Sequence, residues 1–231
     1  GARPALPGNA LEMIERSLPA WERLAKELGG EAVSADSRQV YRGMDIGTGK
    51  DVDEYSLDGQ TVECHLVDIV EPGYHYNVFE YQRDFLEVWN DMLQRGKQPV
   101  LCGGSGMYLE SVLKGYKLIN VPLDDRLREE LAGKSDSELV NLLKSFRPLH
   151  NTTDILSRKR LVRAIEIEKY QSHNKGKKFS YPEFSNVIFG IHAARELVRE
   201  RITERLSFRL ENGLIEEVRS LLSSGLTSEQ L

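Results

Sequence analysis

Asp36 and Ser37 follow a short, largely apolar run, residues 31–35, which predicts a buried strand. In open α/β sheets, ligands bind in the crevice at the carboxyl ends of the strands. A carboxylate at that position can orient or deprotonate a nucleophile that lies within hydrogen-bonding reach. The alternative is that Asp36 or Ser37 only caps the following turn.

A glycine turn with the sequence Gly-Gly-Ser-Gly, residues 103–106, lies between a predicted strand over 99–102 and a predicted helix over 107–113. Glycines let the backbone approach a ligand closely, and the free N–H groups of a helix start attract an anion. Ser105 adds a hydroxyl donor at the same place. The alternative is a tight turn in which Ser105 is only the helix N-cap. A strand, a glycine turn and a helix in this order are typical of a parallel α/β sheet.

Lys50 ends a second glycine-rich segment, residues 43–50, with the sequence Gly-Met-Asp-Ile-Gly-Thr-Gly-Lys. This segment either presents the lysine to a phosphate or is only a long surface connection. It is not the phosphate-binding pattern G-x-x-x-x-G-K-[ST], which occurs nowhere in the 231 residues.

Basic residues gather in two predicted helices. The helix over 156–170 carries Arg158, Lys159, Arg160 and Arg163, and a basic loop extends this cluster with Lys175, Lys177 and Lys178. Such clusters neutralise phosphate backbones, although a solvated helix face is the alternative. The helix over 194–211 interleaves arginines with glutamates, a pattern typical of i,i+4 ion pairs. One of its arginines could still clamp a diphosphate at a strand end.

The elements that must position these residues follow from the hydrophobic periodicity. Strands are predicted at 31–35, 65–70, 99–102 and 187–191, and helices at 18–29, 79–95, 107–113, 194–211 and 214–222. A region of mostly polar predicted helices separates the third strand from the fourth, with helices at 124–131, 136–146 and 156–170. We therefore predict an irregular arm, residues 1–17, an α/β core formed by 18–117 and 186–231, and a helical insertion, residues 118–185.

Composition sets the class of protein. The chain has 31 Lys and Arg against 36 Asp and Glu, a net charge of −5, which argues against a surface coated with nucleic acid. Two cysteines, Cys64 and Cys102, fit a reducing compartment, and the five histidines have no metal-binding spacing, so no protein metal site is predicted. No apolar run approaches the ~20 residues of a membrane helix. We expect a cytoplasmic protein that does not enter membranes.

Taken in order, these segments resemble the tRNA dimethylallyltransferase (isopentenyltransferase) family. The matching stretches are residues 34–50, 65–69, 99–108, 160–166, 199–202 and 213–218, and the first of them is highly specific by itself. The resemblance covers residues 18–231. It implies an α/β fold whose parallel sheet is like that of P-loop NTPases, with a helical insertion that binds tRNA.

The resemblance also implies an activity, the transfer of a dimethylallyl group from dimethylallyl diphosphate to N6 of the adenosine adjacent to the anticodon, with Mg²⁺ as cofactor. Asp36 would accept the proton of the adenine amine, Ser105 would bind the diphosphate, and Arg201 would stabilise the leaving diphosphate. The residues that fall where the family contacts tRNA are Ser37, Arg38, Gln39, Arg158, Lys159, Arg160 and Arg163. Diphosphate contacts are expected at Gly103, Gly104 and Lys50, and the protein is expected to be a monomer.

One departure from the family pattern concerns its first phosphate loop, of the type G-P-T-x-S-G-K-T. The aligned residues here, 11–18, read Leu-Glu-Met-Ile-Glu-Arg-Ser-Leu. We expect this chain to lack that loop and the family's C-terminal part. Two alternatives to an active tRNA prenyltransferase stay open, a catalytically impaired tRNA-binding fragment or homologue, and a prenyltransferase that acts on free adenine nucleotides.

Overall fold

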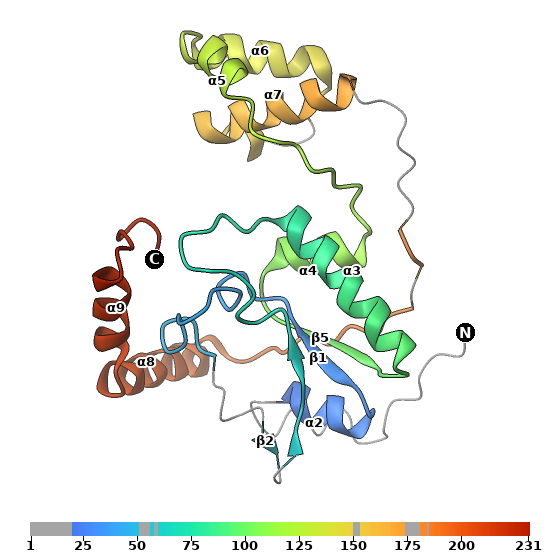
Figure 1. The fold of residues 1–231 in the computed structure, drawn as a ribbon, viewed down its shortest axis with the longest axis vertical. Coiled ribbons are helices and arrows are strands. Elements are labelled where there is room, and N and C mark those ends of the chain that lie inside the picture. Colours follow the sequence, from blue (N-terminus) through green and yellow to red (C-terminus); the bar gives the residue numbers. More distant parts are fainter. Residues whose placement is uncertain (1–19, 51–55, 58–59, 150–152, 174–180, 184) are drawn as a thin grey trace. The chain divides into compact units, whose positions relative to one another are not determined.

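Figure 1 shows the computed structural model of the chain, which describes residues 20–50, 56–57, 60–149, 153–173, 181–183 and 185–231. The chain divides into two compact units. A sheet unit comprises Gly1–Tyr116 and Pro182–Leu231, and a helical unit comprises Lys117–Tyr181. The predicted insertion spans nearly the same residues as the helical unit. The predicted arm and the basic loop with Lys175, Lys177 and Lys178 lie outside the described residues.

Three parallel strands form the sheet, in the order β4, β1, β5. Their bounds are β1 Glu31–Ser34, β4 Cys64–His65 and β5 Pro99–Cys102. All four residues of the central strand β1 are buried, as expected of a strand covered on both faces. The register pairs Ser34 with Cys102, so β1 and β5 end side by side. A separate antiparallel pair joins β2 (Ser56–Leu57) to β3 (Gln60–Thr61).

Helices cover both sides of this sheet. In Figure 1, α3 (Val78–Gln94) and α4 (Gly106–Leu113) lie on one side, and α2 (Ala20–Glu27) lies on the other. The core between the strands and helices α3 and α4 consists of Val33, Ala35, Leu66, Tyr81, Phe85, Met92, Tyr108 and Val112. Tyr81 stacks on Tyr108 with 4.0 Å between ring centroids, and its hydroxyl donates to the Ser34 carbonyl at 3.1 Å. The core therefore holds the carboxyl end of β1 against both helices.

Two predicted strands need correction. The strand predicted over 65–70 ends at His65, because Leu66 and Asp68 have φ values of 62° and 55°, in the left-handed region that interrupts extended backbone. The chain then turns so that Asp68 and Ile69 donate to the carbonyls of Gln39 and Val40, at 3.0 and 2.9 Å. Within the described part, the segment predicted as a strand over 187–191 pairs with no neighbour. Its apolar side chains are mostly exposed, so the alternating pattern alone does not make a strand.

The sheet unit closes with two helices, α8 (Arg195–Glu211) and α9 (Leu214–Ser223), which confirm the predicted pair. Gly213 joins them with a φ of 101°, a conformation that favours glycine. Neither helix has a buried residue in the part of the chain that the structure describes.

The helical unit packs three helices and a short 3₁₀ turn, Thr153–Ile155. The helices are α5 (Asp125–Ala132), α6 (Asp136–Phe146) and α7 (Arg158–His173), which confirms the three predicted there. Their core is rich in leucine: Leu127, Leu131, Leu139, Leu143, Leu161, Ala164 and Ile165. Across both units, none of the described helices combines the length and the apolar character needed to cross a membrane.

Candidate functional site

The two loops that follow β1 and β5 meet at the carboxyl ends of these strands. The Ser37 amide donates to Ser105 Oγ at 2.9 Å, and Ser105 Oγ donates to Ser37 Oγ at 3.1 Å. Asp36 stands next to this pair and is half-buried. Ser34 and Cys102 are paired in register at the ends of the two strands. Asp36, two residues after Ser34, and Ser105, three residues after Cys102, are therefore expected to lie near each other. The structure thus brings together three residues that the sequence singled out, Asp36, Ser37 and Ser105.

The hydrogen bonds show that Asp36 caps its turn, whereas the side chain of Ser105 does not cap its helix. The Asp36 carboxylate accepts the Arg38 amide at 2.8 Å, which closes the turn, so the capping interpretation holds for this residue. Ser105 is the N-cap residue of α4, yet its side chain makes no capping hydrogen bond. Its hydroxyl instead faces Ser37.

Gly103 lets the second loop reach the first. Its φ is +155°, and a Cβ built there would lie 2.4 Å from the Ala35 carbonyl oxygen. That close approach allows the Ser105 amide to donate to the same oxygen at 3.1 Å. Gly104 has open space beside it and is exposed. Diphosphate binding by these glycines stays a prediction.

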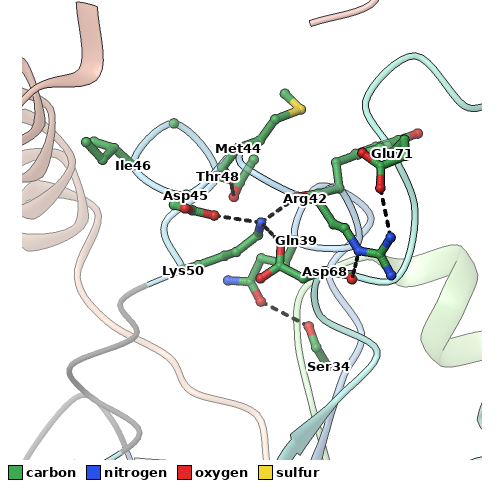
Figure 2. Close-up of polar contacts among 12 residues, drawn as sticks. Ser34, Gln39, Arg42, Met44, Asp45, Ile46, Thr48, Lys50, Asp68 and Glu71 are labelled. Atoms are coloured by element: carbon green, nitrogen blue, oxygen red, sulfur yellow. Dashed lines mark hydrogen bonds and ion pairs between the residues drawn. The ribbon is translucent and has the colours of Figure 1, made fainter. Parts of the chain in front are cut away.

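Lys50 has internal partners in this conformation, and its binding of diphosphate stays a prediction. It ends residues 43–50, hereafter the glycine loop, and it is 4% exposed. Its ammonium donates to the Tyr41 carbonyl, to Asp45 Oδ1 at 2.9 Å and to the Asp68 carboxylate, as Figure 2 shows. These acceptors use all three ammonium hydrogens. A buried ammonium needs such partners, and the lysine therefore holds the loop closed.

Gln39, predicted to contact tRNA, also has partners inside the protein. Its Nε2 donates to the Gly49 carbonyl at 3.0 Å, and its Oε1 accepts the Ser34 hydroxyl at 3.0 Å. Among the three neighbouring candidates, Arg38 is exposed, whereas Ser37 and Gln39 are half-buried.

The basic cluster of α7 likewise contains two arginines with partners inside the protein and two exposed cations. Arg158 donates to the carbonyls of Leu131, Ala132 and Lys134 at the end of α5 and pairs with Asp136 at 2.6 Å. Arg163 donates to the Val121 carbonyl at 2.7 Å and to Glu166 at 2.9 Å. Lys159 and Arg160 are exposed. The first two arginines therefore hold the helical unit together, which charge clustering alone did not indicate.

Arg201 lies exposed on α8 and, among the described residues, forms no hydrogen bond or ion pair with Asp36, Ser37 or Ser105. The same helix does reach the glycine loop. A Cβ at Gly49 would lie 2.0 Å from a guanidinium nitrogen of Arg209. The next helix contributes Glu217, whose carboxylate accepts three consecutive amides of this loop. Sequence reasoning missed this contact, although Glu217 lies in the segment 213–218 that carried part of the resemblance.

At the opposite end of β1, Glu31, Glu63 and His65 form a cluster of possible metal ligands. Their carboxylate oxygens and imidazole nitrogen lie within 4.8 Å of one another. Arg95 occupies both Glu31 oxygens at 2.5 and 2.7 Å, and His65 Nε2 lies 2.8 Å from one of them. Hydrogen bonding from Arg95, supported by His65, outweighs burial and lowers the pKa of Glu31 to about 2. This end of the strand is a structural ion-pair network.

The fold is that of an α/β protein in which the candidate residues Asp36, Ser37 and Ser105 lie at the carboxyl ends of two adjacent parallel strands, where ligands bind in open α/β sheets. The IPP transferase family model matches residues 39–231. The chain is 52% identical, over 213 residues, to tRNA dimethylallyltransferase 2 of Phocaeicola vulgatus, covering 92% of this chain and 69% of that protein. The chain belongs to the IPP transferase family.

Solved structures agree on the fold. A tRNA isopentenylpyrophosphate transferase from Staphylococcus epidermidis has a TM-score of 0.58 and 28% identity, over 95% of this chain and 71% of that one. A eukaryotic dimethylallyltransferase acting on tRNA has a TM-score of 0.69 over 91% of this chain and 55% of that one, at 21% identity. The predicted α/β class and the predicted family are confirmed.

Proposed function

We propose that this protein transfers a dimethylallyl group from dimethylallyl diphosphate to the N6 amine of the adenosine adjacent to the anticodon of a tRNA. The observation that carries the proposal is that Asp36 and Ser105 converge, through Ser37, at the ends of two adjacent parallel strands. This arrangement supplies a proton acceptor and a hydrogen-bond donor at the same edge of the sheet, where ligands bind in open α/β sheets. The relative from Phocaeicola vulgatus carries the name of the same activity.

In this reaction one bond forms while another breaks. The N6 nitrogen attacks the allylic carbon of dimethylallyl diphosphate, the carbon–oxygen bond breaks, and its electron pair leaves with the diphosphate. Asp36 accepts the proton that the amine loses. Ser105 donates to a diphosphate oxygen, and Arg201 neutralises the charge that develops on the leaving group. The adenine must leave its stack so that the nitrogen aligns with the carbon.

Mg²⁺ is part of the proposal as the cofactor. This ion prefers oxygen ligands and is usually held by few protein groups together with substrate phosphates. The adjacent hydroxyls of Ser37 and Ser105, 3.1 Å apart, form an oxygen donor set that fits an ion bound to a diphosphate. When bound, Mg²⁺ would neutralise negative charge on that diphosphate.

The proposed tRNA contacts are the exposed side chains of Arg38, Lys159 and Arg160, together with Ser37. Exposed cations are suited to the phosphate backbone because, within the part of the chain that the structure describes, these side chains have no internal partners to give up. A tRNA substrate implies a compartment that holds tRNA, so a cytoplasmic location belongs to the proposal, as does a monomeric state.

The test is transfer of a labelled dimethylallyl group to tRNA, with AMP as a competing acceptor. We expect Mg²⁺-dependent incorporation, with a loss of about 10²–10⁴-fold in Asp36→Asn, because the amide cannot accept the proton. Glu87→Gln, at an exposed carboxylate of α3, is the matched control and should retain the rate.

Three outcomes would contradict the proposal. Equal incorporation by wild type and Asp36→Asn would remove the role of this carboxylate. Prenylated AMP with unmodified tRNA would favour the adenine-nucleotide enzyme. Salt-dependent tRNA binding without any product would favour the impaired tRNA-binding protein.

A further inference from the structure

Glu217, on α9, binds a segment about 170 residues earlier in the chain. Its Oε2 accepts the amides of Asp45 and Ile46 at 2.8 and 2.7 Å, and its Oε1 accepts the Gly47 amide at 2.9 Å. Successive N–H groups that converge on one anion form a backbone nest, and charge-assisted hydrogen bonds are about twice as strong as neutral ones. This carboxylate therefore fixes the first half of the glycine loop.

Lys50 fixes the second half. Its side chain is fully buried, whereas those of its partners Asp45 and Asp68 are 51% and 45% exposed. Asp45 belongs to both attachments, because its amide binds Glu217 and its carboxylate binds Lys50. The loop is thus held at two places, in its middle by Glu217 of α9 and at its last residue by the buried ammonium of Lys50.

A short series of hydrogen bonds leads from this loop to Asp36. The Gly49 carbonyl accepts Gln39 Nε2 at 3.0 Å, Gln39 Oε1 accepts the Ser34 hydroxyl at 3.0 Å, and Ser34 Oγ accepts the Asp36 amide at 3.2 Å. Figure 2 shows the contact of Ser34 with Gln39 beside the loop that Lys50 closes. The backbone that presents Asp36 is therefore joined to the loop that Glu217 holds.

We propose that Glu217 is a positioning residue for Asp36. It fixes the glycine loop, and the loop, through Gly49, Gln39 and Ser34, sets the turn from which the Asp36 carboxylate projects. In this assignment Gln39 relays position and does not contact tRNA. The inference rests on the proposed function, in which Asp36 accepts a proton.

The first experiment compares steady-state transfer by the full chain and by Glu217→Ala. We expect kcat to fall about 10-fold, while KM for tRNA and for dimethylallyl diphosphate stay within about twofold, because misalignment of the proton acceptor affects the transition state and not substrate binding. Gln39→Leu should show the same pattern, whereas loss of a tRNA contact would raise KM. The control Glu216→Ala removes a neighbouring exposed carboxylate of α9 and should leave both constants unchanged.

A double-mutant cycle tests whether Glu217 acts through Asp36. In the Asp36→Asn background, Glu217→Ala should cause no further loss of kcat, because the group that it positions is already gone. A full additional 10-fold loss would overturn the proposal. So would a change in KM alone.

Amide hydrogen exchange separates this inference from the proposed function. Glu217→Ala, and the milder Glu217→Gln, should speed exchange at Asp45, Ile46 and Gly47 and also at Asp36 and Arg38. If wild type forms no prenylated product, the proposed function fails, and exchange still decides the positioning role. Unchanged exchange at Asp36 and Arg38 in both variants would overturn that role.

Discussion

The two ends of β1 carry carboxylates in opposite circumstances. Glu31, at the amino end, is 5% exposed and has both oxygens engaged by Arg95 and one also near His65. Asp36, just past the carboxyl end, is half-buried and accepts the amide of Arg38. At the amino end of β1 lies a carboxylate with both oxygens paired, whereas the carboxylate just past its carboxyl end accepts, among the described residues, the amide of Arg38 at one oxygen.

The difference teaches that partners, more than residue type, decide what a carboxylate can do. Glu166 in the helical unit repeats the arrangement of Glu31. Burial raises its pKa, but hydrogen bonds from Arg128 and Arg163 outweigh this effect and lower the pKa to about 2. A carboxylate so paired stabilises the fold and is poorly suited to accept a substrate proton.

The largest expected effect is at the carboxyl end. Ser105→Ala should lower the transfer rate about 100-fold, the usual cost of removing one donor to a developing oxyanion. The free energy of unfolding should fall by only about 1 kcal/mol, because the side chain makes no capping bond but its loss leaves the part-buried Ser37 amide without its acceptor. Transfer kinetics and urea unfolding measure the two quantities. Ser105→Thr keeps the hydroxyl and should retain the rate, and a destabilised but fully active alanine variant would contradict the comparison.

The amino end should behave in the opposite way. Arg95→Met leaves Glu31 buried without its main partner and should lower the free energy of unfolding by about 2–3 kcal/mol. Transfer per folded molecule should be unchanged. Trp21 and Trp89 are the chain's two tryptophans and both lie in the sheet unit, so their fluorescence reports its unfolding. The control is Arg83→Met, since Arg83 pairs with Asp84 at the surface and should cost at most about 1 kcal/mol.

Acid should weaken the same end. The folded-state pKa of Glu31 is about 2, below its ordinary value of 4.5. Because the folded-state pKa is the lower one, the stabilisation is complete above pH 4.5 and is lost as the pH falls toward 2. Urea unfolding followed by tryptophan fluorescence should show this loss in wild type and a flatter dependence in Glu31→Gln. Parallel curves for the two proteins would show that the Arg95 pairing does not carry the acid sensitivity.

The smallest effect concerns exposed cations of α7. Lys159→Ala and Arg160→Ala should each weaken tRNA binding about two- to fivefold and lower the magnitude of the salt slope by about one. Filter binding at several salt concentrations measures both values. Arg158→Ala is the informative contrast, because its guanidinium holds three carbonyls at the end of α5, and it should lower the melting temperature of the helical unit. Equal salt slopes in all three variants would remove the distinction between the exposed and the engaged cations.

Local patterns predicted most elements, and they placed Asp36 and Ser105 separately, each just after a predicted strand; the structure shows that these two strands are neighbours that end together. They failed where distant partners decide. Leu66 adopts a left-handed backbone conformation that cannot be predicted from a leucine. Lys50 can be buried because the carboxylate of Asp68, 18 residues away, accepts a hydrogen bond from its ammonium. Charge clustering likewise identified Arg158 but not the α5 carbonyls that engage it. The roles of Asp36, Ser105 and Arg201 in catalysis remain predictions.

The contact between Glu217 and the glycine loop also constrains the order in which the chain folds. Its partners are separated by 170–172 residues, whereas contacts between helices of the helical unit span far fewer, 22 residues for Arg158 with Asp136 and 38 for Arg128 with Glu166. Local contacts form first because they close short loops. The helical unit lies in sequence between the glycine loop and α9. Once it has folded, the chain that connects these two segments is shorter, so that closing the loop between them costs less entropy. Completion of the nest is therefore expected among the last folding events, after synthesis has reached α9.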